Sequence, residues 1–308
     1  MDSAWASPTR LGVRALSLSL LLTGAAHARC EDYVPQARPQ NAGRDIVGQD
    51  LDQIEERGFI TFAVYDDFHP WSWTGENGPE GVDVEIGRLI AEALGVKARF
   101  RMSEAGETID TDLRVNVWQG LPNGGGVVNV MMHVPYDSEY ACRVDQVVFT
   151  GQYAEERIAV AYRTDVWPED DAPVPANFRF DPVGVENDSL SDFFLSTFAG
   201  GAVGALVHRY HDYPDAMDAL AAGEVAAVMG PKAHLEAGIA GHPGVGLAVH
   251  EPPLPGLARG TWTVGVAVHT AYRSLGYAVD DAIASALDDG RMEAIFARHG
   301  LTLDRPDR

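Results

Sequence analysis

Residues 59–101, FITFAVYDDFHPWSWTGENGPEGVDVEIGRLIAEALGVKARFR, contain the pattern that decides the fold. The run from Phe59 to Val64 is rich in aromatic and β-branched residues, which is typical of a buried strand. Residues 96–101 have strand composition again, and Gly95 before them is a helix C-cap signal. Between the two strands, apolar side chains recur with a helical period at Ile86, Leu89, Ile90, Ala93 and Leu94. The stretch therefore predicts a strand–helix–strand unit of a parallel sheet.

The same alternation continues on both sides of a proline-rich break at residues 167–182. We expect further strands at residues 127–132, 146–149, 155–163, 183–185, 225–229 and 261–269, and helices at 52–57, 137–142, 191–197, 215–222, 271–288 and 290–299. This order predicts an α/β fold of two lobes, each a mostly parallel sheet flanked by helices. Lobe 1 is expected to hold residues 51–155 and 264–308, and lobe 2 residues 156–263. Hinge crossings would join them, and a ligand cleft would lie at the junction.

The N-terminal residues 1–28 have the features of a secretory signal peptide. Arg10 and Arg14 form a basic region, an apolar run follows from Ala15 to Ala25, and small residues flank a cleavage site at Ala26-His27-Ala28. The apolar run is too short to span a bilayer permanently, and no later run is longer. We therefore expect export to the periplasm, a soluble mature protein, and an extended arm at residues 29–50.

The formal net charge of −22 argues against binding of nucleic acid or anionic membranes, which requires clustered Lys and Arg. It is compatible with a basic partner protein, and equally with solubility alone. The two cysteines, Cys30 and Cys142, would be in an oxidising compartment and could form a disulfide, or remain two separate thiols. Their spacing does not indicate zinc.

Several segments together resemble the type II periplasmic solute-binding proteins of ABC importers, in the amino-acid-binding family. The matching segments are residues 63–73, 81–86, 143–153, 222–228 and 292–296. A closer likeness is carried by residues 130–137 (VMMHVPYD) and 228–231 (VMGP), which are similar to the subgroup associated with pyrroloquinoline-quinone (PQQ)-dependent alcohol dehydrogenases. The resemblance implies a binding protein without catalytic residues of its own. Its partner would be a periplasmic quinoprotein dehydrogenase or an ABC permease.

The resemblance places candidate ligand-binding residues in both lobes. Phe68 stands where an aromatic ring covers the ligand, with Trp71 and Trp73 beside it. Both tryptophans could instead belong to the lobe core, and for Trp73 the core is the favoured interpretation. Arg143 matches the arginine that grips a ligand carboxylate, with a surface ion pair to Glu139 or Asp145 as the alternative. Ser189 could donate to the ligand, or serve only as a helix N-cap.

Departures from the family pattern indicate a different ligand. Tyr65 and Pro231 occupy the two positions where the family has carboxylates for the ligand ammonium, and His133 and Tyr136 occupy places of small hydroxyl residues. We therefore expect an aromatic crevice without acidic side chains. Such a crevice would bind a planar or anionic organic molecule, PQQ among them, in preference to a free amino acid.

Other constellations are weaker. His208, His211 and Asp212 could contact a metal, but no further ligand lies near in sequence and a solvated loop is the simpler interpretation, so we expect no metal site. An enzyme on the same scaffold, such as a dehydratase of small cyclic acids, would need an acid–base pair in the cleft. Glu104, Glu139 and His133 are the only candidates, and we expect no enzyme.

Overall fold

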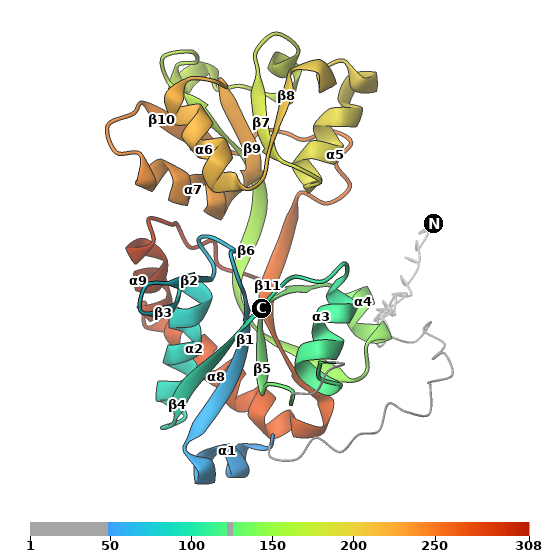
Figure 1. Ribbon diagram of the computed structural model, residues 1–308, viewed down its shortest axis with the longest axis vertical. Helices are drawn as coiled ribbons and strands as arrows, with labels where there is room; N and C mark the ends of the chain where they lie inside the picture. Colours follow the sequence, from blue (N-terminus) through green and yellow to red (C-terminus); the bar gives the residue numbers. More distant parts are fainter. Residues whose placement is uncertain (1–48, 122–125, 308) are drawn as a thin grey trace, which may run out of the picture.

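Two long strands join two lobes in the computed structural model, which describes residues 49–121 and 126–307 (Figure 1). The strands are β6 (Val147–Arg163) and β11 (Thr261–His269). They pair antiparallel from Thr261↔Arg157 to His269↔Val147 and pass together from one lobe into the other. The fold is thus a two-lobed α/β fold, as the sequence predicts.

The predicted signal peptide and nearly all of the predicted N-terminal arm lie outside the described residues. Cys142 is disulfide-bonded, but Cys30, its predicted partner, also lies outside them, so the pairing stays a prediction. Among the described residues, no helix is long and apolar enough to cross a membrane.

Lobe 1 contains the strand–helix–strand unit that residues 59–101 predict. β1 pairs in parallel with β4, from Phe59↔Lys97 to Tyr65↔Ser103. The elements of lobe 1 besides the two joining strands are α1 (Leu51–Arg57), β1 (Phe59–Tyr65), β2 (Trp73–Gly75), β3 (Gly78–Glu80), α2 (Val82–Ala93), β4 (Lys97–Ser103), α3 (Ile109–Leu113), β5 (Val130–Tyr136), α4 (Ser138–Arg143), α8 (Arg273–Asp288) and α9 (Arg291–Arg298).

Lobe 2 is smaller and is built on the far half of β6. Its elements are β7 (Val183–Glu186), α5 (Leu190–Thr197), β8 (Val207–Tyr210), α6 (Tyr213–Ala222), β9 (Ala227–Pro231), α7 (Lys232–Gly241) and β10 (Leu247–His250). Apart from β2 and β3, which form a separate two-stranded sheet, the strands of the two lobes form one continuous sheet in the order β4-β1-β5-β11-β6-β9-β7-β8, with β10 paired to β6. In the continuous sheet, β1 pairs in parallel with β4 and β5, and β7 with β8 and β9, whereas β6 and β11 pair antiparallel with their neighbours.

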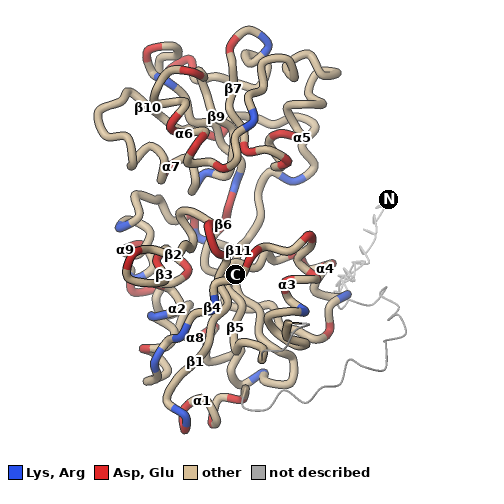
Figure 2. The backbone as a smooth tube through the Cα atoms, in the orientation of Figure 1, with Lys and Arg blue, Asp and Glu red and all other residues tan. Residues whose placement is uncertain are grey.

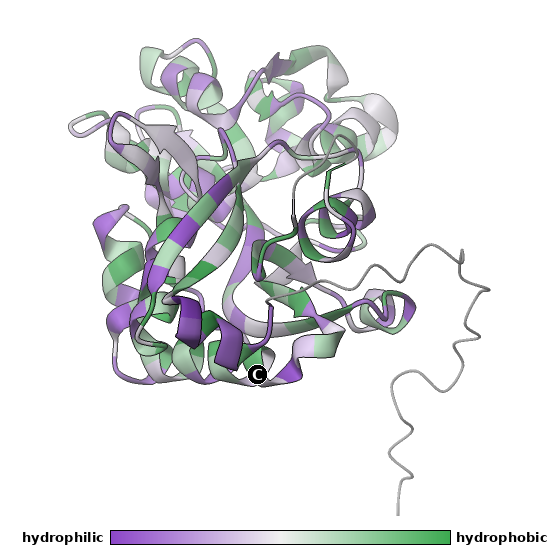
Figure 3. Ribbon diagram, turned by 60° about the horizontal axis from the view of Figure 1, so that its bottom comes forward, coloured by the Kyte–Doolittle hydropathy of each residue, from purple (hydrophilic) through white to green (hydrophobic). Residues whose placement is uncertain are grey.

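Each lobe has apolar cores on the faces of its sheet. In lobe 1, Phe62 and Val64 of β1 pack with Ile90 of α2 and Ile283 of α8, and all four are buried. In lobe 2, separate buried clusters form on the two sides of β6 and β9. Figure 3 shows hydrophobic and hydrophilic residues interleaved along the helices and strands, as expected for elements that bury one face.

Two predicted strand boundaries are wrong because of β-bulges. Residues 146–149 and 155–163 form one strand, β6, because Gly151 adopts a left-handed conformation (φ 55°) and the register against β11 shifts between Val264 and Val266. The predicted strand 127–132 instead runs from Val130 to Tyr136, through a second bulge at His133. A bulge breaks the alternation of side chains without ending the ladder, so the sequence pattern suggests a strand end where there is none.

The helix α7 and the strands β8 and β10 were not predicted from the sequence. α7 begins after Pro231 without a side-chain N-cap, and β8 and β10 are four residues long. Short elements without caps or clear periodicity are held by tertiary packing, which leaves little local signal.

Gly230 on β9 provides a test of how tightly lobe 2 is packed. A Cβ at this position would overlap the ring of Tyr213, so we expect Gly230→Ala to lower the free energy of unfolding by about 1–3 kcal/mol. Gly241→Ala is the control, because its Cβ would meet nothing within 4 Å, and it should change stability by less than about 0.5 kcal/mol. Urea denaturation measures both, and equal losses would contradict the packing argument.

Candidate functional site

A cavity of about 250 Å³ lies where the two joining strands pass between the lobes. Glu156 of β6 lies directly opposite Trp262 of β11, so both side chains project from the same face of the sheet. Ile158, two residues further along β6, lies on that face as well. The cavity is lined by Phe68, His133, Glu156, Ile158, Glu186, Asn187, Asp188, Ser189, Leu190, Tyr213, Pro231, His234 and Trp262.

Lobe 1 contributes two rings to this cavity. Phe68 follows β1 in a turn closed by hydrogen bonds with Ser72, and its ring centroid lies 5.0 Å from that of His133 and 5.2 Å from that of His234. His133 reaches the cavity from β5. Because His234 belongs to α7 of lobe 2, the Phe68–His234 contact joins the lobes across the cavity.

Lobe 2 contributes the loop that follows β7 and the start of α5. Ser189 is the N-cap of α5, where its hydroxyl accepts from the backbone N–H of Asp192 at 3.2 Å, and it lines the cavity at the same time. Asp188 before it adopts a left-handed conformation (φ 59°), which Asp tolerates better than most residues. Glu186 ends β7 immediately before this loop.

Carboxyl groups dominate the electrostatics of the cavity, although Lys232 lies near enough to Glu156, and His211 to Glu186, to lower their pKa values slightly. Glu156 is only 4% exposed, and burial, with Glu236 and Asp304 nearby, raises its pKa to about 8. Burial and the charge of Asp212 raise the pKa of Glu186 to about 7. Neither carboxyl forms an ion pair with a described residue. Burial lowers the pKa of His234 to about 3, so this imidazole is neutral at physiological pH.

The prediction of a crevice without acidic side chains is therefore wrong. Glu156, Glu186 and Asp188 line the same cavity as Phe68. The prediction considered two positions, Tyr65 and Pro231, and these indeed carry no charge. The carboxyl groups come instead from the joining strand β6, from the end of β7 and from the loop after it. The prediction did not consider acidic residues of these segments as part of the crevice.

The structure brings four of the predicted ligand-binding residues together and places four elsewhere. Phe68, His133, Ser189 and Pro231 line the cavity, and their contact with a ligand stays a prediction. Trp71 was expected at the ligand, but it is fully buried beneath the cavity against Phe296. The hydroxyl of Tyr65 donates to Asp112 at 2.8 Å. Tyr65, Tyr136 and Arg143 line neither this cavity nor the second one described below.

Arg143 lies on the exposed surface of α4, where its guanidinium stands 5.6 Å from the ring centroid of Tyr140. The family arginine that it matches would point into the cleft. Two of the predicted acid–base candidates, Glu104 and Glu139, are likewise exposed and line neither cavity.

Sequence reasoning missed two groups of residues. Glu156 could have been found from the sequence, because strand alternation places it on the same face as the apolar residues Ile158 and Val160, which indicates a buried acid. Asp83 carried a similar one, as an acidic residue between Val82 and Val84 at the buried start of a helix. Trp262, Glu186, Tyr213 and His234 had no comparable local signal, and only the fold brings them to the cavity.

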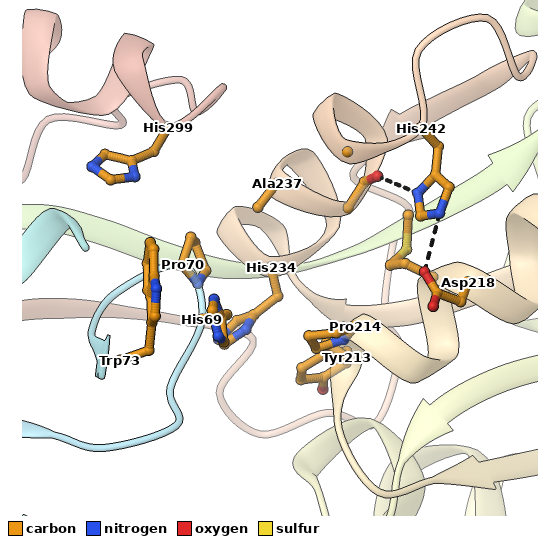
Figure 4. A pocket seen from close by; sticks show the side chains of 13 residues that line it. His69, Pro70, Trp73, Tyr213, Pro214, Asp218, His234, Ala237, His242 and His299 are labelled. Carbon is orange, nitrogen blue, oxygen red and sulfur yellow. Dashed lines mark hydrogen bonds and ion pairs between the residues drawn. The ribbon is translucent and has the colours of Figure 1, made fainter. Parts of the chain in front are cut away.

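A second cavity of about 430 Å³ lies on the other side of Tyr213 and His234, which line both cavities (Figure 4). From lobe 1, Trp73 stacks on His69 with ring centroids 4.3 Å apart. Trp73 therefore lines an opening between the lobes, whereas a core position was the favoured interpretation of the sequence. From lobe 2, His242 lies 3.1 Å from Asp218.

The predicted absence of a metal site concerned the histidines around residue 210. His208 and His211 are exposed, and Nδ1 of His211 lies 3.5 Å from a carboxylate oxygen of Asp212. Within residues 49–121 and 126–307, no group of three or more His, Cys, Asp or Glu side chains is arranged to hold a metal ion.

Two lobes, two joining strands and a cavity between them form a two-lobed α/β fold, and solved structures share this fold. An ancestral cationic amino acid solute-binding protein superposes with a TM-score of 0.63 at 18% identity, covering 80% of this chain and 98% of that one. An amino acid ABC transporter substrate-binding protein from Streptococcus pneumoniae, bound to L-arginine, gives a TM-score of 0.58 at 16% identity, covering 81% and 97%. A histidine kinase sensor domain with similarity to periplasmic binding proteins gives 0.53 at 23%, covering 80% and 98%.

The fold is therefore that of the type II periplasmic solute-binding proteins, as the resemblance of the five matching segments implied. The three structures are named as binding proteins or as a sensor domain, not as enzymes. No protein-family model matches the chain, and no curated protein matches it. The likeness to the PQQ-associated subgroup stays a prediction.

Proposed function

We propose that this protein is an exported solute-binding protein whose two lobes close on a small organic cation. One observation carries the proposal: Glu156 and Glu186 line a common cavity, their pKa values are raised by burial, and neither forms an ion pair with a described residue. A buried carboxylate is costly unless a positive charge compensates it, and a cationic ligand would supply that charge. The rings of Phe68 and Trp262 line the same cavity, where an apolar ligand body or a cation could contact them.

The comparisons support this ligand class. One similar structure is named as a cationic amino acid solute-binding protein, and another holds L-arginine. The predicted signal peptide at residues 1–28 supports export to the periplasm. In this proposal the protein delivers its ligand to an ABC permease.

A second proposal concerns the partner. The likeness of residues 130–137 and 228–231 to the PQQ-associated subgroup supports a role as accessory protein of a quinoprotein dehydrogenase. The net charge of −22, with acidic residues distributed over both lobes (Figure 2), would favour docking to a basic surface. PQQ itself is a poorer ligand for this cavity, because its three carboxylates would meet Glu156, Glu186 and Asp188.

Thermal-shift measurements on the purified protein test the ligand class. The panel would contain polyamines, basic amino acids, neutral amino acids, dicarboxylates and PQQ. We expect the melting temperature to rise only with the cationic members, since a ligand that binds the folded state alone stabilises it by mass action. Shifts confined to dicarboxylates or PQQ would overturn the proposal of a cationic ligand.

A further inference from the structure

Asp83 is a fully buried carboxyl group at the start of α2, between the buried apolar residues Val82 and Val84. Its Oδ1 accepts a hydrogen bond of 2.6 Å from the hydroxyl of Tyr153. Its Oδ2 has no hydrogen-bond partner and lies 3.2 Å from Nδ1 of His133, within ion-pair distance. A carboxyl group so deeply buried needs polar neighbours, and the imidazole of His133 is the one beside its unbonded oxygen.

His133 occupies a strained position that holds its ring at the cavity. Its φ of 55° is left-handed within a strand, at the bulge where the register of β5 against β11 shifts between Gly265 and Ala267. Such a conformation is unfavourable for a residue other than glycine, so the surrounding structure must hold it in place. The imidazole is 9% exposed, with the ring of Phe68 at 5.0 Å and that of Trp71 at 4.5 Å.

The two nitrogens of this imidazole have different surroundings. Nδ1 faces the Asp83 carboxylate and also lies 3.4 Å from the Tyr153 hydroxyl. The Tyr153 hydroxyl donates its one proton to Asp83, so its oxygen can only accept from the imidazole, and Nδ1 therefore carries a proton. Nε2 is on the opposite edge of the ring, and His133 lines the cavity, so Nε2 is the nitrogen available to a ligand. When the imidazole is doubly protonated, Nε2–H donates to an oxygen of that ligand.

We propose that Asp83 is a positioning residue for His133, and that His133 binds an anionic oxygen of the ligand in place of the exposed Arg143. This inference rests on the proposed cationic ligand and deepens it. The ligand would lie across the cavity with its anionic group against lobe 1 and its cationic group toward Glu186 of lobe 2 and Glu156 of the joining strand. Specificity for a carboxylate would thus depend on an imidazole paired with a buried acid.

The variant His133→Asn tests the ligand contact, because asparagine tolerates the left-handed backbone and removes the imidazole. The probes are two matched pairs, L-arginine with agmatine and L-lysine with cadaverine, which differ only by the carboxylate. Calorimetry should show that the unmodified protein prefers the carboxylate-bearing member of each pair. We expect His133→Asn to reduce that preference about tenfold or more, since a hydrogen bond between charged groups is lost. The control His208→Asn changes an exposed histidine that lines neither cavity, and it should leave the preference unchanged.

A ligand-free measurement tests the positioning role separately. In ¹⁵N NMR spectra recorded at high pH, the neutral ring of His133 should carry its proton on Nδ1, and Tyr153→Phe should leave that tautomer in place. Asp83→Asn should shift the tautomer of His133 toward Nε2–H. It should also reduce the preference for the carboxylate-bearing ligands, as His133→Asn does. If Asp83→Asn does not fold, the tautomer seen in the spectrum of the unmodified protein still tests the positioning role.

Three outcomes would overturn this inference. The first is an Nε2–H tautomer in the unmodified protein, which needs no ligand and is therefore distinct from a failure of the proposed function. The second is that His133→Asn lowers the affinity for both members of each pair by the same factor. The third is loss of the carboxylate preference in Arg143→Ala with none in His133→Asn.

Discussion

Replacing Glu186 by glutamine should weaken the binding of a cationic ligand by about a hundredfold. Removing one partner of a buried, hydrogen-bonded charge pair typically costs about 2–5 kcal/mol, and 1.4 kcal/mol corresponds to a factor of ten in affinity. Glutamine keeps the length and shape of the side chain, so the loss would report the charge. It would also leave the cationic group of the ligand in the cavity facing an uncharged amide.

Isothermal titration calorimetry with agmatine measures this effect. Glu224→Gln is the matched control, because it makes the same change in net charge at an exposed position of lobe 2 outside both cavities. We expect its affinity to lie within about twofold of the unmodified protein, as for surface charges in general. An affinity of Glu186→Gln equal to that of Glu224→Gln would show that Glu186 does not bind the ligand.

The affinity for the same cation should rise steeply with pH between 5 and 9. The pKa of Glu186 is raised to about 7 and that of Glu156 to about 8, both mainly by burial. The cation prefers the ionised carboxylates, so binding must displace their protons. Each group costs up to about tenfold in affinity for each pH unit below its pKa. Agmatine keeps its charge over this range, since amines and guanidinium groups titrate above it.

The stability of the ligand-free protein should change in the opposite direction. The pKa of Glu156 in the folded protein, about 8, lies above its ordinary value of 4.5. A raised pKa means that the folded state binds the proton more tightly, so the stabilisation is complete below pH 4.5 and is lost as the pH rises through 8. For Glu156 the free energy of unfolding should fall by roughly 1.4 kcal/mol per pH unit at most in this range.

Calorimetry in buffers of different ionisation enthalpy measures the protons released on binding. Proton release near pH 7, together with tighter binding at pH 9 than at pH 6, would support the cationic ligand. An affinity that falls with rising pH would contradict it. In that case the two carboxyl groups would act as neutral acids that donate to a ligand rich in acceptors, as PQQ is, and the second proposal would be favoured.

The amino-acid sequence alone was sufficient to predict the unit of β1, α2 and β4 and the division into two lobes. These features depend on short-range periodicity and on the C-cap glycine at position 95, which act within about 40 residues of chain. Phe68 was identified through the resemblance of residues 63–73 to the amino-acid-binding family, which is carried by a short continuous segment.

Only the tertiary structure decided the chemistry of the cavity. Glu156, Glu186 and His133 come from β6, from the end of β7 and from a bulge in β5. Their meeting depends on pairings between strands far apart in sequence, such as Trp262↔Glu156, and on side-chain directions that a bulge reverses. The burial that raises the pKa of Glu156 arises only when both lobes surround it, and no local pattern of residues records that environment.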